Sequence, residues 1–292
     1  MPETHSTERS WQVLRDGRGS AARRRVGTLL REWRAARRLS QLALALRAGV
    51  SPRHLSCVET GKAKPGRDVL ARLADGLEMP LRECNALFMA AGYAPAYPET
   101  SLATPELTAV RRAIALILEH QEPYPAFVLN RIWDVLQGNA AAKRIGRFLC
   151  GGSRHRNMVR RFFDPSDLRT AVVNWEEVAG DLIRHLHDHL NAVPSDTAAR
   201  ALLDEVLAYP DVPPRWRTRE LGAVPSPVLT VEFRKDAQAL RFFSTITTFA
   251  TSRDVTVDEL RLECTFPADD ATAELCQALA RDELETEIPS AK

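Results

Sequence analysis

The stretch 41–60, QLALALRAGVSPRHLSCVET, decides the fold of the front of the chain. Counted from its first residue, the fifth position is Ala45, where a small side chain lets two helices cross. The ninth is Gly49, which suits a turn with positive φ. Leu55 and Val58 follow one turn apart, on one face of a second helix. This order of small residue, turn glycine and apolar pair predicts a helix-turn-helix.

Both predicted helices also carry start signals. Ser40 precedes the first helix as an N-cap. Ser51 precedes Pro52, so the second helix opens with an N-cap serine and a proline in its first turn. Together with the apolar spacing on either side, these signals predict an all-α domain of five short helices, near 26–37, 41–48, 52–60, 67–77 and 80–91.

With Leu55 and Val58 turned inward, one stripe of the second helix faces outward and fits a DNA major groove. Arg53 is the best candidate for reading a base, because its guanidinium matches the O6 and N7 acceptors of guanine. A solvated helix face is the alternative for Arg53 and His54. We expect Glu59 to pair with a nearby arginine instead. The expected DNA contacts are Gln41, Ser51, Pro52, Arg53, His54, Ser56, Cys57, Thr60 and Lys62.

The segment SQLALALRAGVSPRHLSCVETGKAKP resembles the repressor-type helix-turn-helix domains called Xre-like, over residues 26–92. The resemblance implies a fold of five short helices and a double-stranded DNA operator as partner. One such module reads few base pairs, so we expect a homodimer.

The charge distribution agrees with a nucleic-acid partner at the front. Residues 1–100 hold 17 Lys or Arg against 10 Asp or Glu, and the rest holds 23 against 28. Residues 1–25 read as a basic, flexible leader.

The five scattered cysteines form no C-x-x-C pair, which favours a reducing cytoplasm. Because no apolar run reaches about eighteen residues, we expect no membrane span.

A proline-rich linker over 93–106 separates a second domain, 107–282, from the front, and 283–292 reads as a tail. Period changes in the second domain predict two strands, then helices, then three strands. This order predicts an α+β, PAS-like domain with a mostly antiparallel sheet and a cavity between sheet and helices. The expected strands are 126–130, 132–136, 228–234, 239–250 and 259–266, and the expected helices are 107–119, 139–149, 155–163, 174–190 and 196–208.

Four pieces of this region, in order, resemble the ligand-binding domain of MmyB-like transcription regulators. They are EPYPAFVLNRIWDVLQGNAAAKRI, HRNMVRRFFDPSDL, NWEEV and FFSTITTFATSRDVTVDELRLECTFPAD. The match spans most of 105–280. We expect the segment 150–156, CGGSRHR, to be helical, and it departs from the family pattern. The resemblance implies a small-molecule sensor, with a fatty acid or a related apolar acid as ligand.

Aromatic and apolar side chains of the strands would hold the ligand's chain, and Arg156, Arg160 or Arg161 could hold a carboxylate in a bidentate pair. The alternative is that the aromatics are plain core and the arginines are solvated. The expected ligand contacts are Phe127, Leu129, Trp133, Val135, Asn139, Arg156, Asn157, Arg160, Trp175, Phe243, Thr245 and Phe249, with Thr247 on the same strand face as the last three.

Asp181, His185 and His189 share a helix face at a spacing that could bind zinc, but a half-solvated polar face is the preferred interpretation. No phosphate loop, G-x-S-x-G or H-E-x-x-H occurs, so we expect neither an enzyme nor a cofactor beyond a bound apolar ligand. The sequence thus predicts a cytoplasmic, ligand-responsive transcription regulator. Two alternatives stay open: an enzyme tethered to DNA, and a DNA-binding protein whose rear domain docks a protein partner.

Overall fold

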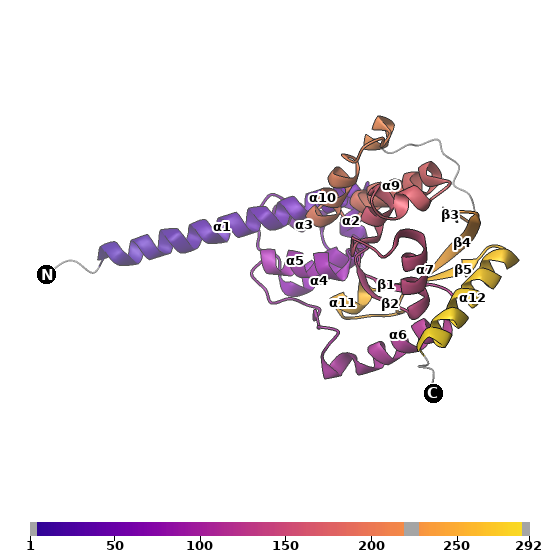
Figure 1. Ribbon diagram of the computed structural model, residues 1–292. Coiled ribbons are helices and arrows are strands. Elements are labelled where there is room, and N and C mark those ends of the chain that lie inside the picture. The colour runs from indigo at the N-terminus through magenta and orange to yellow at the C-terminus, as the bar shows by residue number, and fades with distance from the viewer. Residues whose placement is uncertain (1–4, 219–227, 288–292) are drawn as a thin grey trace. The chain divides into compact units, whose positions relative to one another are not determined.

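The computed structural model describes residues 5–218 and 228–287 of the 292-residue chain (Figure 1). The chain forms two compact units. One comprises the chain up to Glu99, with which the short segments Asn191–Ser195 and Arg253–Val255 are grouped. The other comprises the remaining chain from Thr100 onward. No helix in these described ranges is long and apolar enough to cross a membrane.

The front unit is all-helical, as predicted, but its first helix is much longer than expected. The segment predicted as a flexible leader is helical from His5. The other four helices begin and end within two residues of the predicted bounds. The helices are α1 (His5–Ala36), α2 (Gln41–Arg47), α3 (Pro52–Glu59), α4 (Arg67–Gly76) and α5 (Leu81–Ala90).

The start and turn signals of the motif are confirmed. The Ser40 hydroxyl accepts a hydrogen bond from the Ala43 N–H at 3.1 Å, and the Ser51 hydroxyl accepts one from the His54 N–H at 3.2 Å. Gly49 adopts a φ of 60° in the turn between α2 and α3. These local choices fix where the two helices begin and how the chain reverses between them.

Helices α1 and α3 approach each other backbone to backbone in the front unit. A Cβ added at Gly27 of α1 would lie 2.3 Å from the carbonyl oxygen of Glu59 at the end of α3. Only glycine therefore fits at this crossing. Around it the buried apolar core includes Leu30, Trp33, Leu44, Ala45, Leu55, Val58, Leu70 and Leu73.

The rear unit is built on a five-stranded antiparallel sheet in the order β2-β1-β5-β4-β3. The predicted order of two strands, a helical segment and three strands is confirmed. The strands are β1 (Ala126–Leu129), β2 (Val135–Gly138), β3 (Thr230–Lys235), β4 (Gln238–Thr247) and β5 (Arg261–Pro267).

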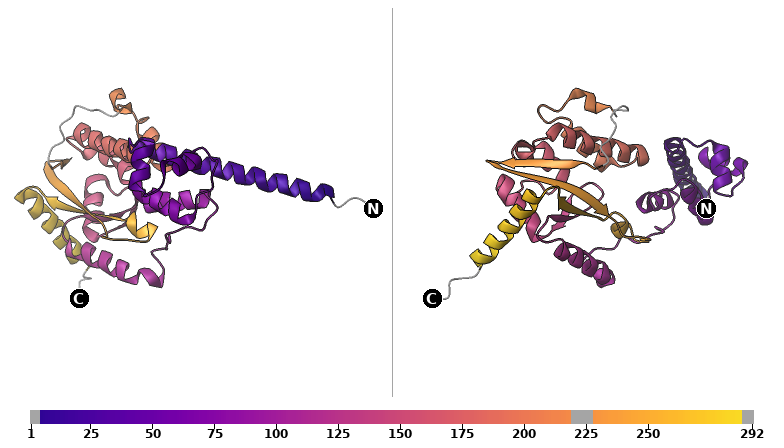
Figure 2. Two further views of the ribbon diagram at one scale, coloured as in Figure 1. Left: turned by 180° about the vertical axis from the view of Figure 1, so that it is seen from behind. Right: turned by 90° about the vertical axis from the view of Figure 1, so that its right-hand side faces the viewer.

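Helices cover both faces of this sheet, as the side view in Figure 2 shows. On one face, Ile114 and Leu118 of α6 pack with Val128 and Leu262. The larger core lies on the other face, among α7 to α10, and Cys276 of α12 joins it. These helices are α6 (Thr108–His120), α7 (Ala140–Cys150), α8 (Met158–Phe163), α9 (Trp175–Ala192), α10 (Thr197–Val206), α11 (Val255–Asp258) and α12 (Asp270–Glu287), joined by 3-10 turns at Pro105–Leu107, Leu168–Ala171 and Pro214–Arg217.

Three local predictions in this unit are corrected. The second strand starts at Val135 and not at residue 132, because the Asn130 side chain accepts hydrogen bonds from two backbone N–H groups of a tight turn that places Trp133 at a φ of 66°. The predicted helical segment 150–156 is not helical beyond Cys150, since α7 ends there and Gly151 adopts a left-handed conformation. Helix α12 was not predicted, and it extends through the start of the expected tail.

Candidate DNA-binding and ligand-binding sites

Helix α3 presents one buried and one accessible face. Leu55 and Val58 are fully buried, as the motif predicts, and Arg53 is exposed on the opposite side. The stripe predicted to contact DNA is therefore open to a partner. Among the predicted contacts the exposed residues are Ser51, Pro52, Arg53, Thr60 and Lys62, and the half-buried ones are Gln41, His54, Ser56 and Cys57.

Glu59 at the end of α3 is a buried anchor, which confirms its predicted structural pairing. Its carboxylate accepts hydrogen bonds from Nε and Nη2 of Arg34, at 2.8 and 3.1 Å. It accepts a third from the Gln41 amide at 2.7 Å. These three hydrogen bonds join the ends of α1, α2 and α3 and fix the orientation of Gln41. They are shielded from solvent, because Glu59 is only 1% exposed.

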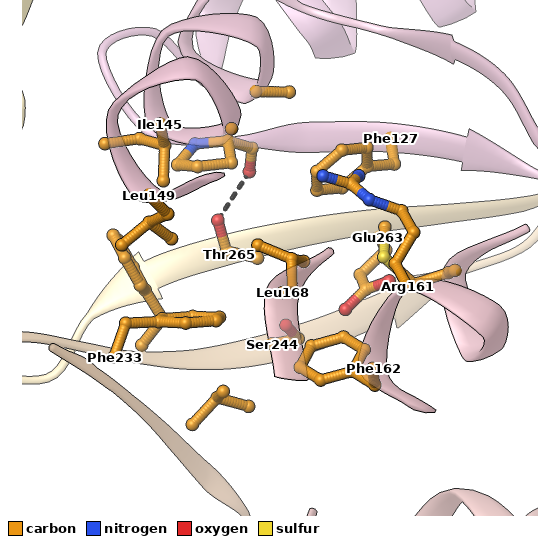
Figure 3. A pocket seen from close by; sticks show the side chains of 16 residues that line it. Phe127, Ile145, Leu149, Arg161, Phe162, Leu168, Phe233, Ser244, Glu263 and Thr265 are labelled. Atoms are coloured by element: carbon orange, nitrogen blue, oxygen red, sulfur yellow. Dashed lines mark hydrogen bonds between the residues drawn. The ribbon is translucent and has the colours of Figure 1, made fainter. Parts of the chain in front are cut away.

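In the rear unit a small cavity of about 80 Å³ lies between the sheet and helices α7 and α8 (Figure 3). Its wall is mostly apolar and aromatic, as expected of a site for a hydrocarbon group. We call it the inner cavity. The apolar side chains labelled in the figure are Phe127, Ile145, Leu149, Phe162, Leu168 and Phe233.

A larger cavity of about 520 Å³, the outer cavity, adjoins the inner one. Its volume falls within the roughly 300–1,000 Å³ of small-molecule sites. Its lining includes Trp133, Asp181 and His185. The two cavities share a wall, formed by Met158, Phe162, Val231, Ser244 and Glu263.

Arg161 is a buried charge on the wall of the inner cavity. It is 7% exposed, and its Nε has no hydrogen-bond partner within the described part of the chain. Arg161 forms an ion pair with Asp167, whose Oδ1 lies 3.6 Å from the Arg161 Nε, too far for a hydrogen bond. The other carboxylate oxygen, Oδ2, accepts hydrogen bonds from the Ser153 hydroxyl at 2.9 Å and the Arg154 N–H at 2.8 Å. The guanidinium therefore lines the inner cavity with one donor unused.

Glu263 is the second charged residue on the wall. It lies on β5, opposite Phe127 of β1 and Ile246 of β4. Its Oε2 is enclosed and has no hydrogen-bond partner among the described residues. Burial raises the pKa of the Glu263 carboxyl, and a hydrogen bond with Ser244 offsets part of that rise. The cavity therefore combines an apolar lining with two polar side chains whose bonding is incomplete.

Comparison with known families decides the classification. The model of the MmyB-like transcription regulator ligand binding domain matches residues 110–279, which is more than half of the chain. The chain belongs to this family. A second model, of a helix-turn-helix domain, matches residues 25–87. Both models describe parts of transcription regulators and not of enzymes, so this MmyB-like protein is a DNA-binding transcription regulator with a ligand-sensing domain.

Comparisons with individual proteins add little. No curated protein matches the chain. A matching solved structure is that of an RNA-binding light-oxygen-voltage receptor, at 13% identity over 98% of this chain and 70% of that chain. Its TM-score of 0.23 is too low to support an argument about this MmyB-like protein.

Within this MmyB-like domain, the cavity-facing side of β4 is the reverse of the predicted one. Ser244 and Ile246 line the cavities, whereas Phe243 stacks on Phe266 on the sheet face covered by α6. Alternation along a strand then carries the rest of the predicted set away from the cavities. Phe243, Thr245 and Thr247 belong to that opposite face, and Phe249 packs in the same cluster as Phe266.

Two predicted ligand contacts are occupied in holding the backbone. Asn139 is buried, accepts hydrogen bonds from the Ala126 and Ala142 N–H groups at 3.0 Å, and donates to the Tyr124 carbonyl. Asn157 caps α8 and donates to the Ile132 carbonyl at 2.6 Å. Neither lines the inner or the outer cavity.

The other predicted ligand contacts fall into two groups, those that line a cavity and those that do not. Phe127 lines the inner cavity and Trp133 the outer one. Of the three arginines weighed for a carboxylate, only Arg161 reaches a cavity, because Arg156 is exposed and Arg160 forms a two-bond pair with Glu205 at 2.7 Å. Leu129, Val135 and Trp175 line neither cavity, and the Trp175 indole N–H donates to the Phe162 carbonyl.

The histidine-rich face of α9 is engaged in separate pairs. His185 Nδ1 lies 3.1 Å from an oxygen of Asp181, and His189 Nε2 lies 2.9 Å from Asp196. His187 Nε2 lies 2.9 Å from the Trp216 carbonyl. No group of three or more potential metal ligands occurs among the residues that the structure describes.

Glu263 was not predicted from the sequence as a site residue. The strict alternation of β5 marked it as polar, and polar residues of such a strand usually face solvent. The signal that could have revealed it is the apolar β1 and β4 on either side, which place β5 in the centre of the sheet, where both faces are covered.

Proposed function

We propose that this protein is a sequence-specific transcription regulator whose rear domain senses a small apolar acid, a fatty acid or a similar molecule. The observation that carries the proposal is the buried Arg161 beside an apolar cavity, in a chain that also presents the open face of α3. An apolar lining selects a hydrocarbon, and a guanidinium with a spare donor selects a carboxylate.

For the DNA half, the residues proposed to make contact are those predicted from the motif, led by Arg53. An operator can be selected from a random DNA pool and its affinity measured by fluorescence anisotropy. We expect Arg53→Ala to lose about 1–3 kcal/mol of specific affinity and to relax the preference at one base pair. Lys62→Ala should weaken all sequences alike. Unchanged discrimination by Arg53→Ala would show that α3 does not read bases.

The assembly proposed for this half is a homodimer on operator DNA, because a single module reads too few base pairs for tight binding. We also propose a cytoplasmic location, which operator binding and the scattered cysteines support. The resemblance of residues 26–92 to Xre-like domains supports this arrangement.

For the ligand half, native mass spectrometry of the full chain purified from cells is the direct test. An added mass of a few hundred daltons that disappears on denaturation would identify a retained ligand. We then expect Arg161→Met to bind carboxylate ligands about tenfold or more weakly, because it loses one charged hydrogen bond. Arg160→Met is the matched control, because this neighbouring arginine pairs with Glu205 away from both cavities.

A second candidate is that the rear domain docks a protein partner. Val228 and Ile246, which line the outer cavity, are 55% and 49% exposed, and such apolar surface suits a protein contact. An empty native mass together with loss of a co-purified protein on Ile246→Asp would favour this candidate over the sensor.

A further inference from the structure

We infer that the ligand carries a hydrogen-bond donor, a hydroxyl or an amine, in addition to its acid group, and that Glu263 recognises this donor. The inference rests on the proposed function, because it specifies the ligand class for the same cavity. It assigns a specificity-determining role to a residue that the apolar character of the site does not explain.

The position of Glu263 points to a ligand and not to solvent. Its β5 neighbours Leu262 and Cys264 turn to the opposite sheet face, into the cluster around α6. Glu263 itself borders both the inner and the outer cavity, where its surroundings include Phe162 and Val231. A carboxyl group in an apolar wall of this kind is costly to bury unless something bonds to it.

The protein supplies only part of that bonding. Ser244 bonds to the Glu263 carboxyl, but Oε2 has no partner in the described part of the chain although it is fully enclosed. A plain alkyl chain beside this oxygen would cover it without offering a donor. A ligand hydroxyl or amine at the same place would satisfy it. The site therefore discriminates against an unsubstituted fatty acid.

The two polar side chains, Arg161 and Glu263, bind different polar groups of the ligand. Arg161 carries a permanent positive charge that attracts a carboxylate, whereas the unbonded Oε2 of Glu263 can accept a hydrogen bond from a donor. In Figure 3 both side chains lie on the wall of the pocket, and Glu263 bonds to Ser244 there. The acid group of the ligand is thus assigned to Arg161 and its donor to Glu263.

Calorimetric titration of the full chain with two kinds of probe tests this inference. The probes are dodecanoic acid and a series of hydroxydodecanoic acids that differ in the position of the hydroxyl. We expect at least one hydroxy acid to bind about tenfold or more tightly than dodecanoic acid, as for one hydrogen bond to a buried carboxyl. Glu263→Leu should abolish this preference while still binding dodecanoic acid. Glu274→Leu, which removes an exposed carboxylate of the same domain, should keep it.

The possible outcomes separate the inference from the proposed function. If dodecanoic acid binds and every hydroxy acid binds no tighter, the inference is overturned and the sensor remains. If no acid binds, the proposed function fails and the inference fails with it. Should Glu263→Leu not fold, Glu263→Met replaces it, since methionine is of similar length and has no carboxyl oxygen to accept the bond. A hydroxyl preference that Glu263→Met leaves unchanged would also overturn the role of Glu263.

Discussion

Replacing Glu59 with alanine should loosen the helix-turn-helix from within. The change removes three hydrogen bonds, two from Arg34 and one from Gln41. It also leaves the Arg34 guanidinium, whose side chain is only 20% exposed, without its partner. Removing one member of a buried ion pair costs about 3–5 kcal/mol. Because water can reach part of Arg34, we expect the low end, ~3 kcal/mol.

Hydrogen exchange read by mass spectrometry measures this loss in the full chain. The amides of α1 and α3 should exchange about a hundredfold faster in Glu59→Ala, since each tenfold corresponds to ~1.4 kcal/mol. Glu78→Ala is the control, because the Glu78 side chain is 76% exposed and lies 3.9 Å from Arg47, a geometry worth ~1 kcal/mol or less. Equal effects of the two variants would refute the reasoning that burial of these three hydrogen bonds makes Glu59 structural.

Three further predictions concern stability, each measured by denaturant unfolding of the full chain. Gly27→Ala should destabilise the front unit by ~2 kcal/mol or more, although alanine is the better helix former, because its Cβ meets the Glu59 carbonyl; a gain in stability would contradict the close approach of α1 and α3. Asn139→Ala should cost ~2–3 kcal/mol through two unsatisfied N–H groups, with ligand affinity changed little. Hydrogen bonds from Ser166 and His155 lower the pKa of Asp164 from 3.8 to about 2. Its contribution to stability is therefore present above 3.8 and lost as the pH falls toward 2, and Asp164→Asn should flatten that part of the pH profile.

The front unit could be predicted almost completely because its signals are local. Ser40, Ser51 and Gly49 act through their own backbone, and the spacing of Leu55 and Val58 defines a buried helix face. The length of α1 could not be predicted in the same way, since its first part lacks the apolar periodicity that usually marks a helix.

The ligand site could be predicted as a cavity but not residue by residue. Strand alternation gives two possible faces, and a sheet covered on both faces offers no apolar-polar contrast to choose between them. That is why Phe243 and Thr245 were assigned to the cavity while Ser244 and Glu263 line it. Asn139 and Asn157, predicted as ligand contacts, cap helices and line neither cavity, because an amide suits a ligand and a helix cap equally well.

The incompletely bonded Glu263 on the cavity wall has a consequence for how this domain changes under mutation. An apolar replacement of Glu263 removes a carboxyl group with an enclosed, unbonded oxygen and fills part of the cavity, so it should be tolerated or even raise the melting temperature. Selection for a stable fold alone would therefore erode this position. Where Glu263 persists among descendants of this chain, recognition of a ligand, and not the fold, is what retains it.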